Sequence, residues 1–502
     1  MGSVISTLKV KKRSIRRLTF NNKNKLLIKP FEEDYDSEDS IDRLSVEDLN
    51  KEDEDHDHGV CKLRQKGREE YGTCQVCNRF NTNYDWCHYC DTEKLTQGWT
   101  SGDKIIDKFI KKTQKKAEYY TDLYLEWIPI ESIAYIQKID QDKTNFNYSA
   151  IWLEGEREYK KLFYPWMKGR SPPIKVMLKT LPNSDDLRDL LNELKTHYKN
   201  AKSSDPINVY GITYITELGK YMMVIEYFDY GDLRDYLKIN FSELKWKSKL
   251  YLLESLARGL SKLHYFEKSI HKDFHTGNIL MIRYLDEEDN ETIKSKIYKS
   301  RVYSKELNEE NKKIYGVLPY IAPEILNGQK YKEVTDVYGF GMIMIEISGG
   351  NPPFYDHPHN FELANKICKG IRPTCPEGTP ECFVELVNEC LDSDPENRPA
   401  TDVILRDIVN WKDIIYSDDI EELSEEQLKI RKEFEEADKL IPDIATNAYK
   451  NMHPKTVWKS QYLKLPKLPD SQKNEDLDDI ILFESEELQE SHKNHDTVKA
   501  QN

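Results

Sequence analysis

The chain has 502 residues, and its 74 Lys and Arg against 89 Asp and Glu give a formal net charge of −15. Hydrophobic residues make up 38% and charged residues 32%, whereas a folded domain averages about 45–50% and about 25%. Part of the chain is therefore expected outside any core, and the acidic balance argues against a protein that coats nucleic acid through a broad basic surface. Without a long apolar run or an apolar signal segment, the nine cysteines indicate a reducing, cytoplasmic compartment.

Residues 1–70 are predicted to be a disordered tail made of two blocks of opposite charge. Residues 1–30 carry nine Lys and Arg and no acid, and residues 32–57 carry fourteen acids against two bases. Such blocks hold too few apolar side chains to offset the entropy of an ordered chain. Residues 466–502, in which Glu, Asp, Lys, Ser and Gln dominate, are expected to form a second disordered tail.

The first six residues, Met1 to Ser6, match the N-myristoylation pattern M-G-x-x-x-S/T, which makes Gly2 a candidate lipidation site. A single acyl chain binds membranes only marginally, but the basic block that follows supplies a second attraction to an anionic surface. We therefore expect peripheral membrane contact through the N-terminus. The alternative is a basic tail in which Gly2 and Ser6 coincide by chance.

Residues 71–100 contain two C-x-x-C pairs separated by nine residues. Four thiolates in two such pairs suit a closed tetrahedral zinc site of the structural kind. The segment is too small to have a core of its own, so the metal would supply its folding energy. Its acidic surroundings favour a protein partner over nucleic acid. The predicted zinc ligands are Cys74, Cys77, Cys87 and Cys90.

Residues 127–412 have the apolar and aromatic density of a large folded domain. Val176 to Lys179 reads as a strand that ends in a lysine, and leucines at helical spacing follow from Leu187 with Glu193 among them. A lysine on a strand facing a glutamate on the next helix forms the ion pair that holds the lysine against nucleotide phosphates. Tyr221 to Tyr227 reads as a further strand that leads into a turn at Tyr230-Gly231-Asp232. This stretch looks like the hinge between two lobes, which implies that adenine would bind backbone groups near Glu226 and Phe228.

The stretch His271-Lys272-Asp273-Phe274-His275-Thr276-Gly277-Asn278 resembles the catalytic loop of protein kinases, H-R-D-x-x-x-x-N. Downstream, Gly316 to Glu324 resembles the end of the activation segment with its A-P-E. The resemblance implies that Asp273 is the catalytic base, that Asn278 binds Mg²⁺, that Asp336 supports the loop and that Arg398 pairs with Glu324. It also implies ATP and Mg²⁺ as cofactors, protein substrates, and an α+β, bilobal fold with a small β-rich N-lobe and a larger helical C-lobe.

Several local stretches resemble more closely the tyrosine-kinase-like proteins expanded in arbuscular mycorrhizal fungi. They are Leu125 to Pro129, Trp99 to Gly102, Tyr315 to Tyr320, the end of the catalytic loop and the pair His453-Pro454. The resemblance spans about residues 70–465. We expect residues 413–465 to be a helical extension in which an amphipathic helix over 420–440 packs on the C-lobe.

Two departures from the kinase pattern bear on activity. A glycine-rich loop should cover the phosphates between about Tyr135 and Trp152, yet no glycine occurs from Asp103 to Glu154. An aspartate of a D-F-G motif should follow Asn278 by about a dozen residues, and the sequence offers Lys296 or Glu291 there. His275 also stands where serine/threonine kinases carry a lysine, which leaves the acceptor specificity undefined.

These departures indicate a catalytically impaired kinase, a pseudokinase that acts as a regulator or scaffold in signal transduction. The retained Lys179, Glu193, Asp273 and Asn278 keep a second function open, an active ATP- and Mg²⁺-dependent kinase that phosphorylates Ser, Thr or Tyr. In that case Asp286 or Asp289 would serve as the surrogate metal ligand.

Overall fold

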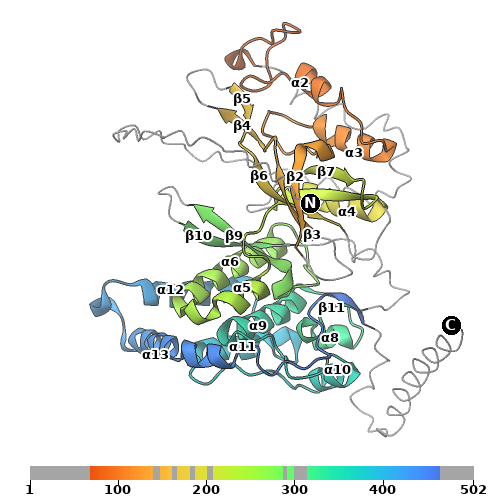
Figure 1. Cartoon of the computed structure of the whole chain (residues 1–502). Coiled ribbons are helices and arrows are strands. Elements are labelled where there is room, and N and C mark those ends of the chain that lie inside the picture. Colours follow the sequence, from red (N-terminus) through yellow and green to blue (C-terminus); the bar gives the residue numbers. More distant parts are fainter. Residues whose placement is uncertain are drawn as a thin grey trace, which may run out of the picture. The chain divides into compact units, whose positions relative to one another are not determined.

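The computed structural model describes residues 68–139, 147–160, 167–180, 187–200, 207–285, 291–298 and 314–463. A β-sheet N-lobe is followed along the chain by a C-lobe made mostly of helices, and a segment with four cysteines precedes the sheet (Figure 1). The predicted α+β class is confirmed. The two predicted disordered tails lie outside the described residues, apart from residues 68–70.

The N-lobe sheet has six strands in the order β1-β7-β8-β6-β3-β2, all antiparallel except β1 with β7. Side chains alternate between the two faces of a strand. In β6 this places Val176 and Leu178 in the core of one face, whereas Met177 and Lys179 point to the other face. The strands are β1 (Glu126–Trp127), β2 (Ile133–Lys138), β3 (Asn147–Trp152), β6 (Ile174–Lys179), β7 (Val209–Ile215) and β8 (Lys220–Glu226).

Two helices share a hydrophobic core with the Met177 face of the sheet: α3 (Lys104–Gln114) and α4 (Leu187–Asn200). Asp103 caps α3 by accepting hydrogen bonds from the main-chain NH groups of Ile105 and Ile106. The buried side of α3 belongs to the same hydrophobic core as the buried leucines of α4, the helix that carries Glu193. The shared cluster includes Ile106, Phe109, Ile110, Leu190, Leu191 and Leu194.

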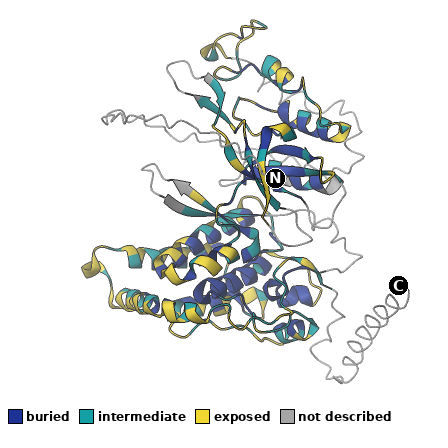
Figure 2. Ribbon diagram, in the orientation of Figure 1, coloured by how far each residue is buried: buried dark blue, intermediate teal, exposed yellow. Residues whose placement is uncertain are grey.

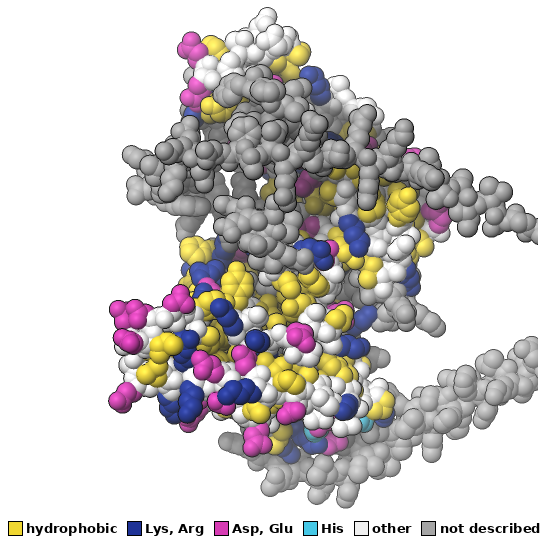
Figure 3. Space-filling model, turned by 60° about the vertical axis from the view of Figure 1, so that its left-hand side comes forward, with side chains coloured by type: hydrophobic (Ala, Val, Ile, Leu, Met, Phe, Trp, Pro, Cys, Tyr) yellow, Lys and Arg dark blue, Asp and Glu magenta, His cyan; other side chains and the backbone are white. Residues whose placement is uncertain are grey.

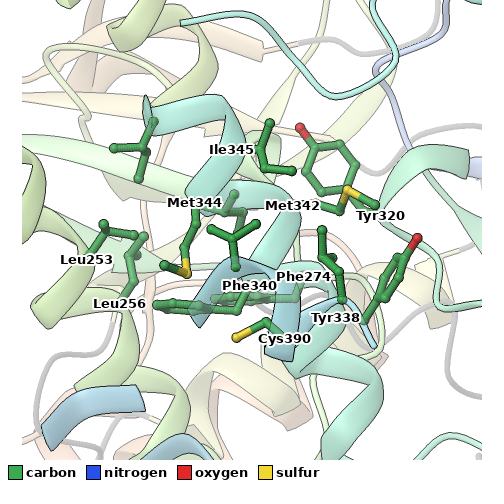
Figure 4. Close-up of a cluster of buried hydrophobic side chains, with 14 of the residues drawn as sticks. Leu253, Leu256, Phe274, Tyr320, Tyr338, Phe340, Met342, Met344, Ile345 and Cys390 are labelled. Carbon is green, nitrogen blue, oxygen red and sulfur yellow. The ribbon is translucent and has the colours of Figure 1, made fainter. Parts of the chain in front are cut away.

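The C-lobe is built around α9 (Glu333–Gly349), an apolar helix in which every residue from Thr335 to Gly349 is buried. A helix that is apolar on all sides requires neighbours all round, and Figure 4 shows side chains of other segments packed against it. In Figure 2 the centre of this lobe is dark blue. Its other helices are α5 (Leu233–Asn240), α6 (Trp246–Tyr265), α8 (Pro323–Leu326), α10 (Phe361–Cys368), α11 (Glu381–Cys390) and α12 (Thr401–Tyr416).

The helix predicted at 420–440 is present as α13 (Glu425–Asn447), which begins with a capping box at Ser424. It packs on the C-lobe as expected: the buried ring of Phe434 lies 5.3 Å from that of Trp246, and Asp438 accepts a hydrogen bond from the Trp246 main chain at 2.7 Å. After α13 the chain forms β12 (Gln461–Leu463), which pairs with β11 (Ile314–Gly316).

Candidate functional site

The four predicted zinc ligands lie together. The sulfur atoms of Cys74, Cys77, Cys87 and Cys90 are all within 4.8 Å of one another, and Cys74 and Cys87 are buried. The main-chain NH of Val76 points at Cys74 Sγ at 3.4 Å. Hydrogen bonding by the Cys77 main chain lowers the pKa of Cys74 to about 7, whereas contact with the Cys77 thiol raises that of Cys90 to about 12. Four sulfurs at this spacing fit a tetrahedral Zn²⁺ site.

The four-cysteine segment is anchored to the hairpin of β4 (Arg157–Lys160) and β5 (Met167–Arg170), which the sequence analysis did not predict. Trp86 is buried against Ala117 and Tyr124. The Lys168 ammonium lies 3.2 Å from Asp91, in the helix α2 (His88–Leu95) that begins after Cys87. The segment is therefore joined to residues inserted between β3 and β6 rather than being an isolated knuckle.

Lys179 and Glu193 were predicted to act together. Both contact the same third residue, Tyr298. The Lys179 ammonium is 3.3 Å from the centre of the Tyr298 ring, and the Tyr298 hydroxyl donates to Glu193 Oε1 at 2.5 Å. Burial opposes ionisation of Glu193, but His197, Tyr298 and the charge of Lys179 together lower its pKa to about 2. Glu193 is therefore an ionised, fully buried carboxylate at neutral pH.

Tyr298 was missed in the sequence, where Lys296 or Glu291 was expected to replace the metal-binding aspartate. Both belong to β10 (Glu291–Ile297), which pairs with β9 (Ile279–Leu285), and Glu291 lies opposite Leu285 at the far end of this hairpin. The residue that follows β10 and reaches Lys179 is Tyr298. Tyr298 directly follows β10, the second strand after the catalytic loop. This position was the one signal in the sequence that could have identified it as a site residue.

Lys296 instead faces the strand end that was expected to bind adenine. Its ammonium lies 2.8 and 3.0 Å from the two carboxylate oxygens of Glu226, and both side chains are largely buried. Phe228, two residues further on, is buried in the core shared with α4, and its carbonyl accepts from the Gly231 NH at 3.2 Å. A buried ion pair thus lies beside the backbone groups predicted to hold the base.

The catalytic loop brings Asp273 and Asn278 together. Asn278 Nδ2 donates to the Asp273 carbonyl at 2.8 Å and to its carboxylate at 3.0 Å. The loop also contacts Tyr298: His271 Nε2 lies 3.1 Å from the Tyr298 carbonyl, and the Tyr298 NH donates to the Asn278 carbonyl at 2.8 Å. The residue that adjoins both the loop and Lys179 is therefore a tyrosine, which offers a phenol hydroxyl and no carboxylate oxygen.

Asp336 holds the catalytic loop from α9. Its carboxylate accepts from the main-chain NH groups of His271 and Lys272 at 2.7 and 2.8 Å and lies 2.9 Å from His264 Nε2. One turn further along α9, a Cβ on Gly339 would lie 2.5 Å from the Phe274 carbonyl, so only glycine allows the helix to approach the loop this closely.

Glu324 and Arg398 form a buried bidentate pair, with donor to acceptor distances of 2.7 and 2.9 Å. Arg398 also donates to the carbonyls of Val334 and Asp392. The end of the activation segment is thereby joined to the starts of α9 and α12, and the pair is the one that the resemblance to protein kinases implies.

Asp273 has a further partner that the sequence did not indicate. The Ser460 hydroxyl, from the chain after α13, donates to Asp273 Oδ2 at 2.7 Å and lies 2.8 Å from His275 Nε2. Burial opposes ionisation of Asp273, but His275 and Ser460 hold its pKa below the ordinary value. No local motif marks Ser460, because its position depends on the path of the chain across the C-lobe.

Several predicted features lie outside the described residues: Gly2, the lid region over residues 140–146, and the surrogate metal ligands Asp286 and Asp289. Among the residues that are described, the four cysteines form the group of three or more side chains placed to hold a metal ion.

A catalytic loop held by Asp336, together with the Lys179, Glu193 and Glu324–Arg398 arrangements, defines a protein-kinase domain. The family model for protein tyrosine and serine/threonine kinases matches residues 155–408, and the chain belongs to this family. Membership implies ATP, Mg²⁺ and protein substrates as the usual partners of such a domain.

Curated proteins to which the chain is similar include several protein kinases. A probable serine/threonine-protein kinase of Dictyostelium discoideum is 29% identical over 274 residues, which are 51% of this chain and 17% of that protein. The probable serine/threonine-protein kinase roco5 of the same organism is 31% identical over 192 residues, 36% of this chain and 7% of that protein. Serine/threonine-protein kinase VIK of Arabidopsis thaliana is 28% identical over 287 residues, covering 55% and 63%. The chain thus spans less than two thirds of each of these relatives.

In the described part of the chain, no helix is long and apolar enough to cross a membrane. On the face in Figure 3, Lys and Arg side chains of the C-lobe alternate with Asp and Glu.

Proposed function

We propose that this chain is a signalling protein whose kinase domain transfers phosphate poorly or not at all and serves as a binding module for other proteins. The observation that carries the proposal is Tyr298. Its ring covers the Lys179 ammonium and its hydroxyl is bonded to Glu193, at the position that adjoins the catalytic loop. A tyrosine there supplies no carboxylate to a metal ion.

The expected loss of rate is large. Removing one preorganised charge-stabilising group typically lowers the rate of a reaction about 10²–10³-fold. A kinase normally turns over at about 1–100 s⁻¹. Lack of both the glycine-rich loop and the metal aspartate would bring this rate below about 10⁻³ s⁻¹. The Lys296–Glu226 pair adds a cost to nucleotide binding wherever the base requires Lys296 to move.

The alternative is an active kinase that phosphorylates Ser, Thr or Tyr. It is favoured by the intact arrangement of Asp273 and Asn278, whose side chains are 3.0 Å apart. In that case Asp286 or Asp289 would have to supply the missing metal ligand.

Incubation of the purified full chain with γ-labelled ATP, Mg²⁺ and a generic protein substrate tests the proposal. We expect no label transfer above that of the Asp273→Asn variant. Transfer to substrate or to the chain itself that disappears in Asp273→Asn would reject the proposal and support the alternative.

Three further assignments belong to this proposal. The first is that the four-cysteine cluster holds a structural Zn²⁺. The second is that the chain is cytoplasmic, with Gly2 as an acylation site that recruits it to a membrane. The third is that it is one of the tyrosine-kinase-like proteins of arbuscular mycorrhizal fungi. The last assignment is supported by the stretches Leu125–Pro129 and Tyr315–Tyr320 and the CxxC pairs. Equal membrane partitioning of the parent and Gly2→Ala would remove the acylation assignment.

A further inference from the structure

The segment after α13 lies where a phosphoacceptor would lie. Ser460 Oγ donates to Asp273 Oδ2 at 2.7 Å, and a general base must lie within about 2.6–3.2 Å of the hydroxyl whose proton it accepts. His275 Nε2, 2.8 Å from the same hydroxyl, gives it a second polar neighbour. Ser460 therefore occupies the place of a substrate hydroxyl.

The residues on the C-terminal side of Ser460 bind as an added strand. Strand β12 pairs antiparallel with β11, with Tyr462 opposite Tyr315. The two rings are 5.1 Å apart, and the Tyr315 hydroxyl donates to the Ser460 carbonyl at 2.9 Å. A Cβ on Gly316 would lie 3.2 Å from Asp273 Oδ1, so a glycine there lets β11 run close beside the catalytic base. Addition of an extended segment to a strand edge is a common mode of peptide recognition.

The residues on the N-terminal side of Ser460 are held by Arg234 and His359. Arg234 donates to the Trp458 carbonyl at 2.9 Å, and its Nε donates to Glu346 Oε1 at 3.2 Å, which holds the guanidinium in place. The Trp458 ring packs edge-on against His359 with centroids 4.5 Å apart, and the Val457 NH donates to His359 Nδ1 at 3.1 Å. Glu346 is fully buried and also accepts from Thr276 of the catalytic loop, so this side of the site is built into the C-lobe core.

We propose that β11, the catalytic loop and the Arg234–His359 side form a peptide-binding site whose resident occupant is the chain's own segment Val457–Leu463. The site takes an extended peptide with a central Ser or Thr hydroxyl on Asp273 and an aromatic residue two positions away on each side. A protein partner that presents such a segment must displace the resident one. The inference rests on the proposed function only in identifying Asp273 as the residue that faces an acceptor hydroxyl.

Binding of a fluorescent peptide with the sequence of Lys455–Leu463 tests the site. A tethered segment has an effective concentration on the order of millimolar, so we expect the full-length parent not to bind the free peptide measurably at micromolar concentration. The full-length double variant Trp458→Ala/Tyr462→Ala, whose own segment has lost both aromatic contacts, should bind it. A peptide with Ala in place of Ser460 should bind that variant about tenfold more weakly, because it lacks the hydrogen bonds to Asp273 and His275.

Gln461→Ala is the matched control, since the Gln461 side chain is exposed in the same strand. We expect it to exclude the free peptide as the parent does. Equal binding of the peptide to the parent and to the double variant would overturn occupancy in cis, and absence of binding to a folded double variant would overturn the site.

Hydrogen exchange of the unmodified parent, compared with that of the free peptide, gives a test that does not depend on whether a variant folds. The amides of Ile314–Gly316 and Gln461–Leu463 should exchange more slowly in the parent and in Gln461→Ala than in the double variant. Exchange of Gln461–Leu463 in the parent at the rate of the free peptide would overturn the proposal. Peptide binding together with Asp273-dependent label transfer would instead reject the proposed loss of activity and leave the peptide site standing.

Discussion

At the residue that follows β10, a tyrosine lies against both of the charged groups that position a nucleotide in active kinases. The Tyr298 side chain is buried, its ring is in contact with the Lys179 ammonium, and its hydroxyl is one of the donors that stabilise the Glu193 carboxylate. Because Glu193 is fully buried, each hydrogen bond to its ionised form offsets part of a large desolvation cost. Tyr298 therefore has a structural role that an aspartate could not take over.

Tyr298→Phe removes one hydroxyl and keeps the ring on Lys179. We expect it to lower the free energy of unfolding by about 1–3 kcal/mol, since a buried charged acceptor loses a donor. Tyr265→Phe is the control, because the Tyr265 hydroxyl bonds Asp402 at the surface, and its loss should cost little. Denaturant unfolding of both variants measures the difference. Equal stability of the two would show that Glu193 does not depend on Tyr298.

The residues that local motifs mark in the sequence could be located from it, and those defined by tertiary position could not. Asp336, Glu324 and Arg398 stand at fixed offsets within contiguous patterns, and the structure places each against the partner that its pattern implies. Tyr298 follows the cationic strand β10, and the length of the β9–β10 hairpin could not be recognised in the sequence. Ser460 reaches Asp273 only because α13 and the chain after it pack on the C-lobe.

At the scale of elements, we expect the four-cysteine segment to depend on a metal for its fold. Apart from its sulfur cluster it has little core, in which Trp86 contacts Ala117 and Tyr124. We expect a zinc chelator to expose residues 68–100 to proteases within the full-length chain while α9 and its neighbours stay protected. Cys74→Ser should mimic the chelator, and Cys382→Ser, outside the cluster, should not. A parent that is cleaved no faster after chelation would contradict the zinc assignment.

Docking of the segment Val457–Leu463 is expected to depend on pH through His359. Burial lowers the pKa of His359 to about 4 in the docked structure, and the charges of Arg234 and His453 act in the same direction. The undocked state therefore takes up the proton first as the pH falls below about 6.5, so docking is complete above that pH and weakens down to about pH 4. Burial opposes ionisation of Asp273, but His275 and the Ser460 hydrogen bond hold its pKa below the ordinary value, which acts against its protonation in the docked structure.

The affinity of the free Lys455–Leu463 peptide for the Trp458→Ala/Tyr462→Ala variant, measured between pH 7 and pH 4.5, checks this dependence. We expect the affinity to fall with the pH and to fall less when His359→Asn is added. An affinity that declines equally with and without His359 would assign the effect to another group.

Elements with a strong pattern were predictable, and inserted ones were not. The strand that carries Lys179, the Glu193 helix and the amphipathic helix of the extension all have clear hydrophobic periodicity. The β4–β5 hairpin is short and charged, and its partners lie more than thirty residues away, as in the bond between Arg157 and the Tyr124 carbonyl. Helix α3 has the required pattern, but only the tertiary structure reveals that it shares a core with α4 and the N-lobe sheet.

At the scale of the whole molecule, segments that precede and follow the kinase domain lie against its predicted site: one at the core around the Glu193 helix, the other at the catalytic loop. Helix α3, which precedes the domain, shares a hydrophobic core with the helix that carries Glu193, and Ser460 in the segment after α13 donates to Asp273 of the catalytic loop. The proposed loss of phosphoryl transfer and the proposed occupation of the acceptor position are separate properties, because one rests on Tyr298 and the other on Ser460. A phosphoryl-transfer assay can separate the effect of Tyr298 from that of Ser460 only when the segment Val457–Leu463 is released.

The measurement that tests the central claim most directly is therefore the rate of phosphoryl transfer from γ-labelled ATP with Mg²⁺ in the full-length Trp458→Ala/Tyr462→Ala variant. Its acceptor position is open, so any remaining loss of rate belongs to the nucleotide side of the site. The account predicts a rate below about 10⁻³ s⁻¹, unchanged by addition of Asp273→Asn. A rate of about 1 s⁻¹ or more that Asp273→Asn abolishes would contradict it and identify an active kinase held inactive by its own C-terminal segment.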